Sequence, residues 1–213
     1  MKPFFLLAIA SLLSTLLPAQ NSRYQQAMLT NIAALDSSFT LDKLTAAANS
    51  FERIANAEPA EWLPAYYAAY ALVMKAFMGA DVKDIDALCN KADELLAKAE
   101  SLSPDNSEIT TLKAMALTAR IQVDGSRGMT LGPKASAMLQ QALQQQPANN
   151  PRAYVQLGQM MYYTPEAFGG GKKAGLQLVE KGLQAYETFV PASNIAPNWG
   201  KPYALQLQQQ WSK

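Results

Sequence analysis

Histidine is absent from this sequence, and cysteine occurs only once, at Cys89. The missing imidazole removes the commonest metal ligand and the commonest general acid or base. A single cysteine allows no disulfide within the chain. Because Cys89 follows the apolar spacing of Ile85, Leu88 and Ala92, we expect it to be a small buried apolar side chain.

These absences argue against catalysis. Serines and carboxylates are plentiful, but the sequence offers no imidazole to activate a nucleophile. Two carboxylates would suffice for glycosidic cleavage, yet nothing in the sequence places a suitable pair in one cleft. The run Gly169-Gly170-Gly171-Lys172-Lys173 lacks the glycine spacing and the preceding strand of a phosphate-binding loop. We therefore expect a protein that is not an enzyme, with no catalytic residues, no cofactor and no metal.

The chain has no large excess of charge of either sign, because it contains 18 basic and 17 acidic residues. A neutral chain lacks the broad positive field that holds nucleic acid or an anionic membrane. Residues 81–108 are nevertheless acidic, and residues 125–213 are basic. One interpretation of this asymmetry is ordinary solvated helix faces, and another is a polarised surface that orients a partner.

Long hydrophobic runs are limited to one, from Phe4 to Leu17. It follows Lys2 and precedes a Pro-Ala pair, which is the layout of a secretory signal peptide over residues 1–20. The run has about 14 residues, short of the roughly 20 that a membrane span needs; an uncleaved anchor is the competing interpretation. We expect a bacterial periplasmic or secreted protein with no stable membrane insertion after cleavage.

The sequence does contain a recurring motif, in which an Ala-large-Ala frame is followed by a proline. Ala92, Leu96 and Ala99 precede Pro104 in its clearest copy. The same frame recurs in three other segments, Ala47-Phe51-Ile54-Pro59, Ala135-Leu139-Ala142-Pro147 and, in degraded form, Gly175-Val179-Gly182-Glu187. A recurrence of about 44 residues indicates stacked helical units.

Apolar spacing predicts nine helices and no sheet, because no segment alternates with a period of two. The helices are expected at about 22–35, 41–57, 61–78, 81–101, 105–123, 134–146, 151–163, 172–189 and 201–212. The aromatic helix at 61–78 is apolar nearly all round and should lie inside the stack. The helix at 201–212, with Tyr203, Leu207 and Trp211 turned inward and glutamines outward, should cap a single domain over residues 21–213.

The repeated unit resembles a tetratricopeptide repeat (TPR). Tyr154, Leu157 and Gly158 match the start of that family's motif, and the Ala-large-Ala-Pro frame matches its second helix. The resemblance implies an all-α fold, a right-handed α-solenoid of stacked antiparallel helix hairpins. The unit here has about 44 residues against about 34 in the family, and the extra residues fall between the two helices of each hairpin.

A narrower likeness is to the T-component of tripartite ATP-independent periplasmic transporters. Asn150-Pro151-Arg152, followed by Pro165 and Phe168-Gly169-Gly170, is similar to the pattern of those exported helical-repeat proteins. This likeness implies a periplasmic accessory protein that binds a small molecule in a pocket enclosed by tyrosines.

The function expected from this architecture is that of an exported scaffold or adaptor that binds a protein or peptide. Its contact surfaces should be the concave face, lined by the first helix of each hairpin, and the loops within hairpins at 79–83, 124–132 and 164–171. The candidate contact residues are Tyr66, Tyr70, Arg120, Arg152, Tyr162, Tyr163 and Phe168. The alternative for the tyrosines is core packing, and a purely structural envelope protein is a third interpretation. The oligomeric state stays open.

Overall fold

The structure is a computed structural model that describes residues 22–37, 40–146 and 148–213. The expected signal peptide at 1–20 lies outside these ranges. Over the described residues the chain forms nine α-helices and no β-strand, apart from an isolated bridge between Asn106 and Gln146. An N-terminal helix at 22–37 is followed by α2 (Leu41–Ala57), α3 (Trp62–Phe77), α4 (Val82–Leu102), α5 (Ser107–Ile121), α6 (Gly128–Ala142), α7 (Pro151–Tyr163), α8 (Lys172–Thr188) and α9 (Lys201–Trp211).

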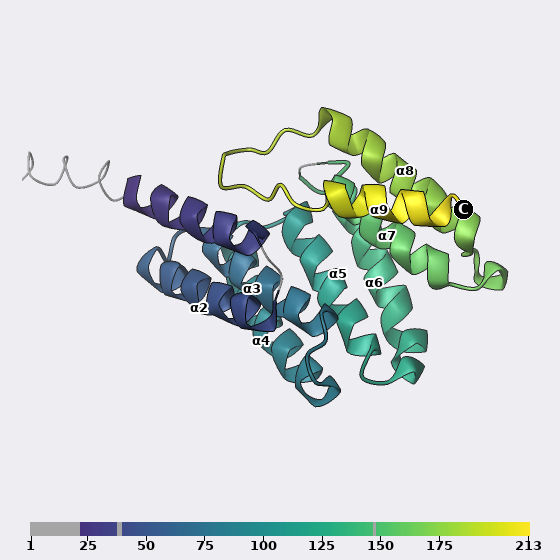
Figure 1. Cartoon of the computed structure of the whole chain (residues 1–213), viewed down its shortest axis with the longest axis horizontal. Helices are drawn as coiled ribbons and strands as arrows, with labels where there is room; N and C mark the ends of the chain where they lie inside the picture. Colours follow the sequence, from purple (N-terminus) through teal and green to yellow (C-terminus); the bar gives the residue numbers. More distant parts are fainter. Residues whose placement is uncertain (1–21, 38–39, 147) are drawn as a thin grey trace, which may run out of the picture.

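The helices stack as hairpins into a curved array (Figure 1). Within the hairpins α3 packs on α4, α5 on α6 and α7 on α8, while α3 also contacts α5 and α5 also contacts α7. The predicted all-α solenoid is therefore confirmed. None of the helices in the described ranges is long and apolar enough to cross a membrane.

The repeated Ala-large-Ala frame is the packing surface of the second helices. Ala92, Leu96 and Ala99 of α4 are fully buried, as are Ala135 and Ala142 of α6. The small residues let neighbouring helices approach closely, and the large residue between them fills the remaining space. The frame thus positions the hairpins against one another, as its recurrence predicts.

The start of α6 differs from the prediction. The sequence suggests that Pro133 stands in the first turn of a helix at 134–146, but α6 begins at Gly128 and contains Pro133. Asp124 explains the difference, because its side chain accepts a hydrogen bond from the backbone N–H of Ser126 at 2.9 Å. This bond caps a 3₁₀ turn (Gly125–Arg127) that leads directly into α6. Pro133 is exposed, so water can reach the carbonyl that the proline leaves without a donor.

Residues 189–200, here named the crossing segment, connect α8 to α9 by a long excursion over the stack (Figure 1). Ile195 and Pro197 are buried within it, and Ile195 joins the same apolar core as residues of α3 and α5. Helix α3 is buried on nearly every side, which confirms that the aromatic helix lies inside the stack. The open concave face expected beside it is instead covered.

Candidate functional site

Three of the candidate contact residues lie in the interior. Tyr66, Tyr70 and Arg152 are expected from the sequence to line an open concave face, but their exposed fractions are 0%, 4% and 1%. The Trp199 ring of the crossing segment stacks on the Tyr70 ring at a centroid distance of 4.7 Å. Its Nε1 donates a hydrogen bond to the Tyr66 hydroxyl at 3.0 Å. The expected exposure is wrong because the chain returns over these side chains after α8.

Arg152 is held in a buried polar network. Its Nε donates to Glu108 Oε2 at 2.8 Å, and its Nη2 donates to Oε1 of the same carboxylate. Asn150, the N-cap of α7, also donates to Glu108 Oε1, and the carbonyl of Trp199 accepts from Arg152 Nη1. Burial acts to lower the pKa of Arg152, but the Glu108 carboxylate outweighs burial and raises it. Arg152 therefore joins α5, α7 and the crossing segment as a permanently charged interior residue.

Arg120 and Phe168 are separate from this network and from each other. Arg120 Nη2 bonds Asp93 Oδ2 at 2.7 Å and Asn90 Oδ1 at 2.8 Å, so it links α5 to α4. Phe168 is 79% exposed on a short 3₁₀ turn (Glu166–Phe168) between α7 and α8. The structure thus does not bring the seven candidate residues together on one face.

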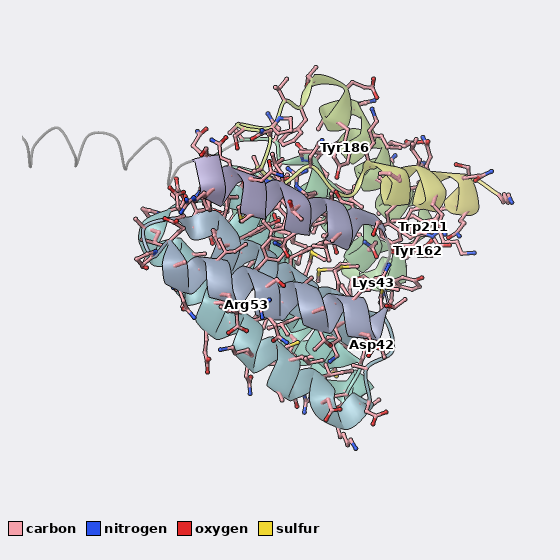
Figure 2. All side chains as sticks on the ribbon, turned by 60° about the vertical axis from the view of Figure 1, so that its left-hand side comes forward. Asp42, Lys43, Arg53, Tyr162, Tyr186 and Trp211 are labelled. Carbon is pink, nitrogen blue, oxygen red and sulfur yellow. The ribbon has the colours of Figure 1, made fainter. Side chains whose placement is uncertain are left out.

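The two remaining candidates belong to a partly exposed aromatic surface that spans α7 and α9. The Tyr162 ring stacks on the Trp211 ring, with centroids 3.8 Å apart and planes 16° from parallel (Figure 2). The Tyr163 ring meets Tyr162 edge to face at 5.1 Å and is 78% exposed. Tyr203 completes what we call the α7–α9 aromatic surface, which consists of Tyr162, Tyr163, Tyr203 and Trp211.

Tyr203 is placed beside this surface by a hydrogen bond from its hydroxyl to Gln159 Oε1 at 2.9 Å. The side chain is 44% exposed. Partial burial raises the pKa of Tyr203, and the neighbouring Tyr163 phenol adds to the shift, so the two hydroxyls lie near each other. The surface therefore presents aromatic rings together with hydroxyl groups.

Local sequence explains why Tyr162 and Tyr163 are held in this position. A Cβ at Gly175 of α8 would stand 2.5 Å from the Cβ of Tyr162, so only glycine permits this close approach of α8 to α7. The turn after Tyr163 needs Gly170, where a Cβ would come within 2.3 Å of the Thr164 carbonyl oxygen. Gly170 and Gly175 thus fix the position of the end of α7 against α8.

Tyr203 and Trp211 are missing from the sequence-based list of candidate residues. Helical spacing predicts that Tyr203, Leu207 and Trp211 pack inward. Leu207 is buried and Trp211 packs partly buried against the same core, as predicted, whereas Tyr203 is 44% exposed. Helix α9 closes the stack and packs mainly on α8, so part of its aromatic side stays open to solvent. Helical spacing alone does not show how far each apolar side chain of α9 is covered, because that depends on contacts with α7 and α8.

Two hollows lie elsewhere, on the N-terminal half of the described chain. One, of about 470 Å³, lies between the N-terminal helix and α2. The other, of about 620 Å³, is lined by residues of α2, α3 and α4, among them Leu72 and Lys75. No group of three histidine, cysteine, aspartate or glutamate side chains in the described ranges is arranged to hold a metal ion.

The stacked helix hairpins define the class of the chain, that of all-α helical-repeat proteins with a TPR-like fold. A thermophilic TPR protein from Thermus thermophilus superposes with a TM-score of 0.54 at 17% identity, over 94% of each chain. This likeness supports the fold alone. The MamA protein, at a TM-score of 0.39 and 16% identity over 88% of this chain and 87% of its own, adds no argument.

A much stronger likeness is to the HusA haemophore from Porphyromonas gingivalis. The two chains are 39% identical and superpose with a TM-score of 0.80, over 88% of this chain and 92% of the haemophore. The chain belongs to the family of the HusA haemophore. No family model matches the sequence, and a search of curated proteins finds no match. The comparisons support the TPR-like part of the resemblance. They give no support to the narrower likeness to T-components.

Proposed function

We propose that this chain is an exported protein that binds haem. The observation that carries the proposal is the 39% identity with the HusA haemophore over nearly the whole length of both chains. Haem is here a cargo, carried by a helical scaffold. This proposal replaces the peptide partner expected from the repeat pattern with a small, planar, anionic ligand.

The α7–α9 aromatic surface suits such a ligand. Aromatic rings stack on planar π-systems, and Tyr163 presents most of its ring to solvent. Clustered exposed aromatic side chains on a soluble protein are typical of binding sites. Because the sequence contains no histidine, recognition at this surface rests on ring stacking and on the phenol hydroxyls of Tyr163 and Tyr203. The surplus of basic over acidic residues in 125–213 favours an anionic ligand on this half of the chain.

The experiment is a titration of the chain from residue 21 with haemin, followed by Soret absorbance and by quenching of tryptophan fluorescence. We expect saturable binding with one dominant site. The double variant Tyr163→Ala and Tyr203→Ala should bind about thirtyfold more weakly, because each of the two aromatic contacts is worth about 1 kcal/mol. Met129→Ala is the matched control, since Met129 is 88% exposed on α6 and lies outside the surface.

Two results would separate the function from its location. No saturable binding to the unmodified chain would contradict the proposed function. Unchanged affinity in the double variant would contradict the α7–α9 aromatic surface as the site and leave haem binding standing.

Export rests on the signal peptide expected at residues 1–20, which the structure does not describe. Expression of the full chain in a bacterium and sequencing of the purified protein's N-terminus tests it. A start near residue 21 in the periplasmic or culture fraction supports export, and an intact Met1 contradicts cleavage.

A second candidate function is the binding of a protein partner. The observation that favours it is a pair of exposed apolar side chains on the hairpin loops and their flanks, Met129 at 88% and Phe168 at 79% exposure. Affinity capture with and without the double variant Met129→Ser and Phe168→Ser would test it. One protein lost specifically with this variant would support the adaptor interpretation.

A further inference from the structure

The groove between the N-terminal helix and α2 has features of a second ligand site. It has a volume of about 470 Å³, within the range of small-molecule sites. The N-terminal helix lies toward the opposite end of the molecule from the C-terminus (Figure 1), so the groove is separate from the α7–α9 aromatic surface. Its apolar lining is formed by Ala27 of the N-terminal helix and by Ile54 and Ala57 of α2.

Tyr24 lines this groove with a buried hydroxyl that lacks a hydrogen-bond partner. The side chain is 7% exposed, and no group in the described part of the chain meets hydrogen-bond geometry with its hydroxyl. Burial, and then the nearby carboxylate of Glu61, raise the pKa of Tyr24, so the phenol keeps its proton as a donor. Buried polar atoms without partners are rare in folded proteins and need an explanation. The Glu61 carboxylate, which interacts with this hydroxyl, accounts for it here, and the hydroxyl is enclosed beside the groove without opening into it.

Two arginines on the same groove are also without an acidic partner. Arg53 Nη2 bonds only the Ser50 hydroxyl, at 3.0 Å, and neither Arg53 nor Arg23 pairs with a carboxylate in the described ranges. The other three arginines of the sequence, Arg120, Arg127 and Arg152, each pair with one. Glu58 lines the groove as well, so the lining carries a single net positive charge. Guanidinium groups of this kind bind carboxylates with high geometric specificity.

We propose that this groove binds an amphiphile that carries a carboxylate. The carboxylate accepts hydrogen bonds from the guanidinium groups of Arg23 and Arg53. The apolar body of the ligand lies on Ala27, Ile54 and Ala57. The assignment does not depend on haem binding at the α7–α9 aromatic surface.

The test is calorimetric titration of the chain from residue 21 with dodecanoate below its micelle concentration. Dodecyltrimethylammonium, which has the same tail and the opposite charge, is the ligand control and should show no saturable binding. Arg53→Gln and Arg23→Gln should each weaken dodecanoate binding by about tenfold or more, because each substitution removes a hydrogen bond between two charged groups. Lys43→Gln, which removes a charge elsewhere on α2 (Figure 2), is the matched control and should bind as the unmodified chain does.

Tyr24→Phe keeps the buried ring and removes only the hydroxyl. It should fold normally and bind dodecanoate and haemin as the unmodified chain does, because the enclosed hydroxyl does not open into the groove. No saturable dodecanoate binding, or equal affinity in both arginine variants and the unmodified chain, overturns the proposal. Loss of haemin binding in the arginine variants overturns it as a second site, because the groove would then be the haem site. Failure of haemin to bind anywhere, with dodecanoate bound as expected, would instead contradict the proposed function and leave the groove site standing.

Discussion

The Arg152 guanidinium at the start of α7 makes a buried bidentate ion pair with the Glu108 carboxylate at the start of α5. The two residues lie 44 positions apart in the sequence, one full repeat of this chain. Asn150 and Tyr66 contribute further hydrogen bonds to the same carboxylate. The pair therefore fixes how two successive hairpins meet, and it does so where the crossing segment passes over them.

Removal of either Arg152 or Glu108 alone should destabilise the fold more than removal of both residues together would suggest. We expect Arg152→Met to lower the free energy of unfolding by about 3–5 kcal/mol, because Glu108 would remain buried and uncompensated. The free energy of unfolding of the double variant, Arg152→Met with Glu108→Leu, should fall by clearly less than the summed losses of the two single variants. Urea unfolding of all four chains measures the coupling. A single variant within about 1 kcal/mol of the unmodified chain would contradict a structural role for the pair.

The crossing segment should depend on Trp199. Trp199→Ala removes the stack on Tyr70 and the hydrogen bond to Tyr66, and we expect a loss of about 3 kcal/mol. Hydrogen exchange should accelerate over residues 189–200 more than in α4. Val190→Ala is the control, because Val190 is 82% exposed in the same segment and should change stability by less than about 0.5 kcal/mol.

Two glycine substitutions should have opposite effects. Gly175→Ala forces a Cβ to within 2.5 Å of the Tyr162 Cβ, so we expect a loss of about 1–3 kcal/mol as α8 moves from α7. Gly132→Ala in α6 meets nothing within 4 Å and should stabilise the helix by up to about 1 kcal/mol. Thermal unfolding of both variants provides the measurement. Equal effects would show that the close approach of α7 and α8 is not what Gly175 permits.

Stability should fall in alkali. Burial raises the pKa of Tyr66, Tyr70 and Tyr186 in the folded chain, so above about pH 10 the unfolded chain loses phenol protons that the folded chain retains. The stabilisation is therefore fully present below about pH 10 and declines as pH rises, by about 1.4 kcal/mol per pH unit for each such tyrosine. Urea midpoints from about pH 8 to about pH 11.5, on either side of the ordinary tyrosine pKa, check this together with tyrosinate absorbance. A midpoint that is constant above about pH 10 would contradict the burial of these phenols.

Helical architecture follows from the sequence because its signals are local. The bounds expected for residues 41–57 and for the helix that begins at Lys201 agree with α2 and α9. Asn150 caps α7 as expected, with its side chain accepting from the N–H of Arg152 at 3.0 Å. Apolar spacing and caps act within one or two turns, so a single sequence shows them directly.

The covering of the concave face could not be predicted in the same way. Residues 189–200 have no regular spacing, and their position depends on contacts of Trp199 with Tyr66 and Tyr70, more than a hundred residues away. Without them, Tyr66 and Tyr70 would indeed face an open groove. Tyr162 and Tyr163 were identified as candidates from the sequence, whereas their partners Tyr203 and Trp211 come from a helix expected to pack inward.

The central claim, that haem binds at the α7–α9 aromatic surface, is tested most directly by hydrogen exchange of the chain with and without one equivalent of haemin. We expect slower exchange confined to the end of α7, around Tyr163, and to α9, around Tyr203 and Trp211. The N-terminal helix and α2 should exchange at the same rate in both states. Protection confined to the N-terminal helix and α2, or no protection at any segment, would contradict it.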